Sequence, residues 1–259
     1  MTRVALQLYT VREECDRDFA VVLAATAELG FDGVELYDLH GLEPHAVRAL
    51  LDRHGLEACG RHAGLDLVDE ELERLAPELV ALGTDRLVVN WIEPPRTVTD
   101  AEAVCERLRL LGQRAGRLGL GLGFHNHAGE LAPLDDGRSF LDHLLQLDGP
   151  TLFLELDLGW AWYAGADPIA LLERAGARAP LVHVKDMRRD GGPVFVPLGE
   201  GSVDYGRLAQ AAGSAGVEWL IIEQDETEGP AFAAVEHSLS ALRKLLGTPA
   251  AAVAGEGLA

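Results

Sequence analysis

Eight short apolar segments recur along the chain, and stretches with helical spacing separate them. The segments occupy residues 4–9, 33–37, 56–62, 86–91, 120–127, 152–157, 181–186 and 219–225. Most of their positions are apolar rather than strictly alternating, which is typical of parallel strands that helices cover. Between them, stretches such as 18–30 and 101–119 place apolar residues at the spacing of an amphipathic helix. The pattern therefore predicts a regular alternation of strand and helix.

Glycines mark the ends of several expected helices. Each follows a helical stretch and precedes the next apolar segment, where a left-handed cap is least costly for this residue. These glycines are Gly30, Gly55, Gly83, Gly119 and Gly216. Eight strand–helix units in about 245 residues match the length of a closed (β/α)8 TIM barrel, whose active sites lie at the carboxyl ends of the strands. We expect one α/β barrel domain over residues 1–247 and a frayed tail at 248–259.

An open, doubly wound sheet is the alternative architecture. It is less favoured because no G-x-G-x-x-G turn follows the first apolar segment. The glycines of residues 119–125, GLGLGFH, fall largely within an expected strand. We therefore interpret them as packing positions or a bulge rather than as a phosphate-binding loop.

The composition narrows the classes of partner. The formal net charge is −20 over 259 residues, and surfaces that bind nucleic acids or anionic membranes need clustered Lys and Arg, so we expect neither partner. Cys15, Cys59 and Cys105 lie far apart without a C-x-x-C motif, which argues against disulfides and a thiolate zinc site. No apolar run has the length of a membrane span and the first residues lack a signal-peptide pattern, so we expect a cytoplasmic protein. Homo-oligomers are common among barrels, and the sequence leaves this open.

Polar and ionisable residues end the apolar segments one after another. They are Glu35, His62, Asn90, His125, His127, Glu130, Glu155, Asp157, His183, Lys185, Asp186, Glu223 and Asp225. Any single one has a structural explanation, since a histidine there is more often a hydrogen-bonded core residue and a lone carboxylate often caps a helix. Gathered around one lumen, however, these charges are costly to bury without a cation. We therefore expect one divalent metal ion, with Mn, Co, Zn, Fe and Mg as candidates.

Several motifs carry a family resemblance. They are LQLYTVRE (6–13), GFDGVELYD (30–38), GFHNHAGEL (123–131), LDLGWAWYAGADP (156–168), HVKD (183–186), LGEGSVDY (198–205) and EWLIIEQD (218–225). In this order they resemble the sugar phosphate isomerase/epimerase family of xylose-isomerase-like barrels, within the AP endonuclease family 2 superfamily. The set is specific for the superfamily but not for one reaction within it.

The resemblance implies a metal site on the last four strands. By motif match, Asp157 of LDLGW, His183 of HVKD and Glu223 of IIEQD are three of its ligands. Many relatives carry a glutamate at the position of His125, whereas chains with the HNH-x-x-E pattern keep one just beyond the strand. The resemblance thus implies Glu130 as the fourth ligand, with His125 itself as the alternative.

The resemblance also implies an activity. A metal held by four side chains can polarise the carbonyl of a small ketose, aldose or cyclitol, and proton transfer through a metal-stabilised enediolate gives an isomer or an epimer. We expect the catalytic residues to be Glu130, Glu223, His125, His127 and Lys185. We expect the substrate-binding residues to be Glu35, His62, Asn90 and Trp160. For Glu35, a helix cap or a buried ion pair with Lys185 is an equally strong interpretation, and for Trp160 ordinary packing is the stronger one.

Other functions are compatible with the same barrel. A metal-dependent dehydratase or lyase on a keto-sugar or inosose would use the same proton abstraction followed by β-elimination, with His125 or His127 protonating the leaving group. A DNA-repair endonuclease needs basic surfaces, which the acidic composition opposes. A sugar-binding barrel without turnover would keep the same ligands, so the sequence leaves it open.

Overall fold

The fold is a closed barrel of eight parallel strands. The computed structural model describes residues 2–147 and 152–247, so the expected tail at 248–259 lies outside the described residues. Neighbouring strands follow the order β1-β10-β7-β6-β5-β4-β3-β2. The strands are β1 (Arg3–Gln7), β2 (Gly33–Leu36), β3 (Glu57–Ala63), β4 (Arg86–Val89), β5 (Gly121–His125), β6 (Leu152–Asp157), β7 (Leu181–Val184) and β10 (Trp219–Ile222). The TIM barrel predicted from the sequence is confirmed.

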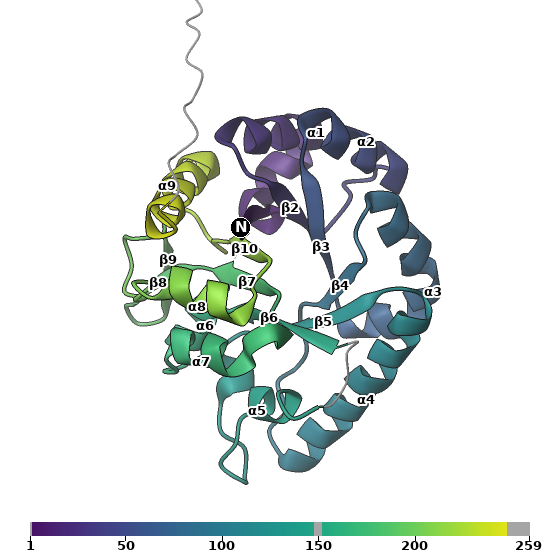
Figure 1. The fold of residues 1–259 in the computed structure, drawn as a ribbon, viewed down its shortest axis with the longest axis vertical. Coiled ribbons are helices and arrows are strands. Elements are labelled where there is room, and N and C mark those ends of the chain that lie inside the picture. Colours follow the sequence, from purple (N-terminus) through teal and green to yellow (C-terminus); the bar gives the residue numbers. More distant parts are fainter. Residues whose placement is uncertain (1, 148–151, 248–259) are drawn as a thin grey trace, which may run out of the picture.

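Helices surround this ring of strands, as Figure 1 shows. They are α1 (Arg12–Leu29), α2 (Pro44–His54), α3 (Leu65–Leu82), α4 (Val98–Arg117), α5 (Phe140–Leu144), α6 (Leu158–Tyr163), α7 (Pro168–Ala175), α8 (Leu208–Ala215) and α9 (Ala231–Leu245). Short 3-10 turns lie at Leu8–Val11, Gly129–Leu131 and Gly176–Arg178. After β7 the chain forms an antiparallel hairpin of β8 (Asp186–Arg189) and β9 (Pro193–Val196). No helix among the described residues is both long and apolar enough to cross a membrane.

The helix ends agree with the glycine pattern. Gly30, Gly55, Gly83 and Gly216 cap α1, α2, α3 and α8 in the left-handed conformation, with φ values of 90°, 69°, 82° and 75°. Gly119 follows α4 with φ of 79°. Because a side chain is strained at these angles, the glycines end the helices where the sequence predicted.

The strands direct alternate side chains into the lumen and toward the helices. The lumen is filled on one level by a separate apolar cluster of Ala5, Cys59, Val88, Leu181, Trp219 and Ile221, with Phe153 packed against it. Glu155 lies two residues beyond Phe153 on β6, and His183 two beyond Leu181 on β7, so they share the inward face. Polar residues therefore fill the lumen toward the carboxyl ends of the strands, above an apolar layer.

The two glycines of β5 make room for an aromatic ring on the next strand. A Cβ atom on Gly123 would overlap the Phe153 ring, and one on Gly121 would lie 3.3 Å from it. The interpretation of GLGLGFH as a packing sequence is therefore confirmed.

Candidate metal centre

Four side chains from four neighbouring strands meet near the carboxyl ends of the strands. His125 ends β5, Asp157 ends β6, His183 lies on β7, and Glu223 follows directly after β10. Each offers one ligand atom, and these atoms all lie within 4.8 Å of one another. All four residues are buried. We call this set the upper group; it contains three of the ligands implied by the sequence, and His125.

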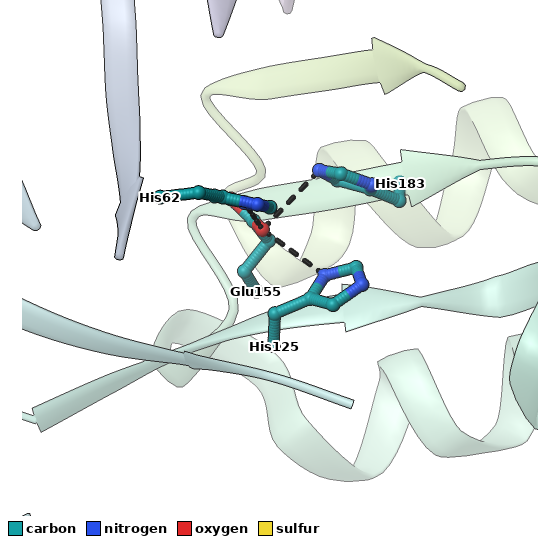
Figure 2. A group of neighbouring side chains, drawn as sticks. All are labelled: His62, His125, Glu155 and His183. Atoms are coloured by element: carbon teal, nitrogen blue, oxygen red, sulfur yellow. Dashed lines mark hydrogen bonds and ion pairs between the residues drawn. The ribbon is translucent and has the colours of Figure 1, made fainter. Parts of the chain in front are cut away.

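A second set lies beside it, deeper in the lumen. His62, His125, Glu155 and His183 form this deep group, whose ligand atoms also lie within 4.8 Å of one another. Figure 2 shows the three imidazoles arranged around the Glu155 carboxylate. Oε2 of Glu155 is 2.7 Å from Nε2 of His62, 3.1 Å from Nδ1 of His125 and 3.2 Å from Nε2 of His183. The two groups share His125 and His183.

Glu35 joins the deep group from the opposite side of the barrel. Its Oε2 atom is 2.7 Å from Nε2 of His183, 3.1 Å from Nε2 of His62, and 2.7 Å from Nε2 of Gln7. Burial raises the pKa of Glu35, but attraction to the two histidines outweighs this and holds it well below its usual value. The ion pair considered for Glu35 from the sequence therefore forms with histidines rather than with Lys185.

Lys185 neutralises the acids of the upper group. Its ammonium is 3.0 Å from Oδ2 of Asp157, 2.9 Å from Oε2 of Glu223 and 3.0 Å from Oδ1 of Asp225, and its side chain is not exposed. Burial lowers the pKa of Lys185, but these carboxylates outweigh it and raise the pKa well above its usual value. Burial raises the pKa of Glu223, but Lys185 and His183 hold it well below the usual value. The carboxylate of Glu223 is therefore ionised.

The three imidazoles of the deep group differ in protonation. Burial lowers the pKa of His62, but Glu35 and Glu155 outweigh burial and raise it to about 10. The pKa of His183 is also raised well above its usual value, because Glu155, Glu223 and Glu35 outweigh burial. By contrast, burial and the neighbouring cations hold the pKa of His125 well below its usual value. Without a metal ion, protons on two histidines balance the buried acids.

The upper group fits a divalent cation. Oδ2 of Asp157 is buried and accepts no hydrogen bond from the described residues, although Lys185 lies within ion-pair distance of it. Nε2 of His125 lies 4.0 Å from the same oxygen. Buried polar atoms without a hydrogen bond are rare unless an ion or water satisfies them. The other oxygen of Asp157 accepts a hydrogen bond from the amide of Trp160 at 2.7 Å and caps α6, which fixes the carboxylate. Two imidazoles and two carboxylates suit Mn, Fe, Co or Zn.

Asn126 fixes Asp157 from β5. Its side-chain oxygen accepts a hydrogen bond from the amide of Asp157 at 3.1 Å, and its side-chain nitrogen donates to the carbonyl of Asp157 at 3.3 Å. His125 and His127 flank Asn126 in sequence, and their rings are 5.0 Å apart. The HNH motif thus supplies two imidazoles near the centre and one amide that anchors the neighbouring strand.

Glu130 lies outside both groups. It is buried on the 3-10 turn Gly129–Leu131, and its Oε2 atom accepts a hydrogen bond from the amide of His127 at 2.9 Å. Burial raises the pKa of Glu130. The structure therefore does not bring Glu130 to Asp157, His183 and Glu223, and His125, the alternative ligand, stands with them instead.

A cavity of about 310 Å³ opens onto both groups. Its lining consists of Tyr9, Tyr37, His62, Asn90, Trp91, His125, His127, Glu223 and Asp225. Among the residues expected to bind substrate, His62 and Asn90 line this cavity. Trp160 packs beside His127 and Phe195, with the Lys185 ammonium 5.4 Å from its ring. A larger depression of about 440 Å³ near Ser139 and Arg174 involves neither group.

Sequence reasoning gave no role to several residues at this site. Gln7 is fully buried and donates a hydrogen bond to Glu35. In the sequence it is visible only as a single amide residue within an apolar strand. Glu155 was recognised at a strand end but was given no role, although it lies two residues before Asp157 on the same face. Tyr9 and Tyr37 also line the cavity, and their rings meet edge to face at 5.4 Å. Nothing in the sequence distinguishes these two tyrosines from tyrosines of the core.

The comparisons with known proteins agree with this architecture. A family model described as a xylose isomerase-like TIM barrel matches residues 23–245. The rhizopine catabolism protein MocC of Rhizobium meliloti is 27% identical over 243 residues, covering 79% of this chain and 74% of that protein. An inosose dehydratase of Geobacillus kaustophilus is 30% identical over 195 residues, covering 65% of this chain and 62% of the dehydratase. The matched region is thus less than two thirds of that dehydratase.

Solved structures share the fold at lower identity. A sugar phosphate isomerase/epimerase from Parabacteroides distasonis superposes with a TM-score of 0.83 at 18% identity, covering 94% of this chain and 98% of that one. The IOLI protein, crystallised with a zinc atom, superposes with a TM-score of 0.75 at 15% identity, covering 95% and 98%. At such identities the similarity shows the fold alone.

Proposed function

Because this chain belongs to the xylose isomerase-like TIM barrel family, we propose that it is a divalent-metal-dependent isomerase or epimerase of a small sugar or cyclitol. One observation carries the proposal: the ligand atoms of His125, Asp157, His183 and Glu223 lie within 4.8 Å of one another, and His125 and Glu223 line the cavity. These four residues are the proposed ligands. The zinc atom in the IOLI protein supports a metal in this fold.

A bound divalent ion would act as a Lewis acid on the substrate carbonyl and orient the neighbouring hydroxyl. Glu223, which lines the cavity and is ionised, would take the proton from the carbon beside that carbonyl. Lys185 and His183 hold its Oε2 atom at 2.9 and 2.8 Å, which fixes the carboxylate. Removal of the proton leaves an enediolate. Return of the proton to the same carbon from the other face gives an epimer. Return of the proton to the former carbonyl carbon gives an isomer.

The remaining cavity residues hold and orient the substrate. Burial lowers the pKa of His127, so its imidazole is neutral and can accept a hydrogen bond from a hydroxyl group. Asn90 and Asp225 offer further polar atoms at the wall, while Trp91, 58% exposed, offers an apolar face to a ring. This mixture of polar and aromatic groups suits a polyhydroxylated substrate.

Dehydration is the second candidate reaction. The similarity of this chain to an inosose dehydratase favours dehydration, and so does His125 at the end of β5. The first step is the same proton removal by Glu223. The β-carbon–oxygen bond then breaks, and His127, once it has taken up a second proton from solvent, would donate that proton so that the hydroxyl leaves as water.

Metal content tests the shared part of the proposal. We would measure Mn, Fe, Co and Zn per chain by mass spectrometry in the wild type and in Asp157→Ala and His183→Ala. Glu78→Gln is the matched control, because Glu78 pairs with Arg61 on the outer side of β3. We expect about one ion per chain in the wild type and the control, and little in the other two variants. A wild type that binds no metal after reconstitution would refute the proposal.

Product analysis then separates the two reactions. Ketoses, aldoses and keto-cyclitols are incubated with the metal-loaded protein in heavy water. Deuterium in an isomer or epimer of unchanged formula supports isomerisation or epimerisation. A product lighter by one water supports dehydration and overturns the isomerase assignment.

A further inference from the structure

The two ring nitrogens of His183 face different carboxylates. Nδ1 is 2.8 Å from Oε2 of Glu223 in the upper group, and Nε2 is 2.7 Å from Oε2 of Glu35 on the far side of the lumen. Neither His183 nor Glu35 is exposed to solvent. The ring is therefore fixed between Glu223 of the upper group and the Glu35 carboxylate, which contacts the deep group from the other side of the lumen.

Glu35 is itself held in place by the neighbouring strands. Gln7, its register partner on β1, donates a hydrogen bond from Nε2 to Oε2 of Glu35 at 2.7 Å. On β3, Gly60 leaves space for the other oxygen, because a Cβ atom there would lie 2.9 Å from Oε1 of Glu35. A carboxylate packed in this way can act as a fixed acceptor for the imidazole.

A neutral imidazole carries its proton on one nitrogen and binds a metal with the other. A carboxylate that accepts the N–H proton selects which nitrogen is left for the metal. We infer that Glu35 is a positioning residue that holds the proton of His183 on Nε2, so that His183 binds the divalent ion through Nδ1. This inference rests on the proposed function, because it assumes that a metal binds.

The inference also selects between the two groups. His183 faces Glu35 and Glu155 of the lumen with Nε2, and a nitrogen that carries a proton cannot be a ligand. His62 and Glu155 then remain an ion pair at 2.7 Å rather than ligands. One ion per chain, in the upper group, follows from this assignment.

Nitrogen NMR of the zinc-loaded protein tests the assignment directly. With histidine labelled by nitrogen-15, long-range correlations show which ring nitrogen carries hydrogen and which binds zinc. His183→Asn identifies the His183 signals by their loss. We expect Nε2 of His183 to be protonated and Nδ1 to be bound to zinc. Zinc on Nε2, or two zinc ions per chain, would overturn the inference while the metal-dependent function stands.

A variant tests the role of Glu35. The amide of Glu35→Gln can donate to Nε2, which would place the proton of His183 on Nδ1 and block the ligand atom. Loss of such a partner weakens metal binding about 10- to 100-fold, and we expect this range when zinc affinity is measured by chelator competition. Glu78→Gln serves as the control for loss of a carboxylate outside the lumen. Unchanged affinity in a folded Glu35→Gln would refute the positioning role.

Two measurements keep the outcomes apart. Circular dichroism of the metal-free proteins shows whether Glu35→Gln folds, and if it does not, the spectrum of the wild type alone decides the question. If the wild type binds no zinc at all, the proposed function and this inference both fail.

Discussion

The ammonium of Lys185 lies 3.0 Å from Oδ2 of Asp157, and neither side chain is exposed to solvent. The same ammonium reaches Glu223 and Asp225. Three carboxylates therefore share one buried lysine at the place where the upper group would hold a cation. Lys185 and the divalent ion would both offset the negative charge of these carboxylates. Each therefore lowers the free-energy cost of burying them.

Removal of this lysine should make folding depend on metal. Breaking a buried ion pair by deleting one partner costs about 3–5 kcal/mol, because the remaining charges stay unpaired. We expect metal-free Lys185→Met to lose about this much unfolding free energy in urea, and to regain more of it than the wild type when zinc is added.

The matched control for this experiment is Lys244→Met. Lys244 is an exposed lysine near the end of α9, so its loss should change stability by less than about 0.5 kcal/mol. If metal-free Lys185→Met were as stable as Lys244→Met, Lys185 would not be needed to balance the buried acids.

Packing of β5 against β6 gives a second prediction. Gly123→Ala places a methyl group on the Phe153 ring, and overpacking of this kind costs about 1–3 kcal/mol. Gly213→Ala in α8 should have the opposite sign, since nothing lies within 4 Å of its Cβ position and alanine is favoured over glycine in a helix by roughly 0.5–1 kcal/mol. Urea unfolding of both variants checks the two signs. Equal stability of Gly123→Ala and the wild type would show that Phe153 repacks freely.

The deep group predicts a dependence of stability on pH. The pKa of His62 is raised to about 10 in the folded metal-free protein, because Glu35 and Glu155 outweigh burial. A raised pKa stabilises the fold fully below the unfolded value of about 6.5. This stabilisation is lost as pH rises from there through about 10.

His62→Gln removes that contribution. We therefore expect the difference in unfolding free energy between wild type and variant to be largest near pH 6 and to shrink toward pH 10, measured by urea unfolding without metal. A difference that grows with pH would mean that His62 is neutral in the fold.

Sequence reasoning reached the fold because local signals agreed with it. The apolar segments and the glycines after helices, such as Gly30 and Gly55, depend on contacts a few residues away. Barrel closure then brings strand ends together, which is why Asp157, His183 and Glu223, expected as ligands from the motif match, lie close to one another.

Contacts across the lumen could not be found in this way. Glu35 and His183 are 148 residues apart, and their hydrogen bond depends on barrel register and on space left by Gly60. The placement of Glu130 depends on a 3-10 turn after β5, and its spacing from His125 in sequence does not reveal the direction of its carboxylate. Such details are set by tertiary packing rather than by local pattern.

The choice between His125 and Glu130 as the fourth ligand gives the last prediction. The carboxylate of Glu130 accepts a hydrogen bond from the amide of His127, whereas His125 offers a ligand atom in the upper group. We expect His125→Ala to lose most of its bound metal. Glu130→Gln should keep about one ion per chain and lose roughly 1 kcal/mol of stability from a weakened buried hydrogen bond. Metal analysis and urea unfolding on the same preparations check both. Metal loss in folded Glu130→Gln with retention in His125→Ala would restore Glu130 as the ligand and require its turn to rearrange when metal binds.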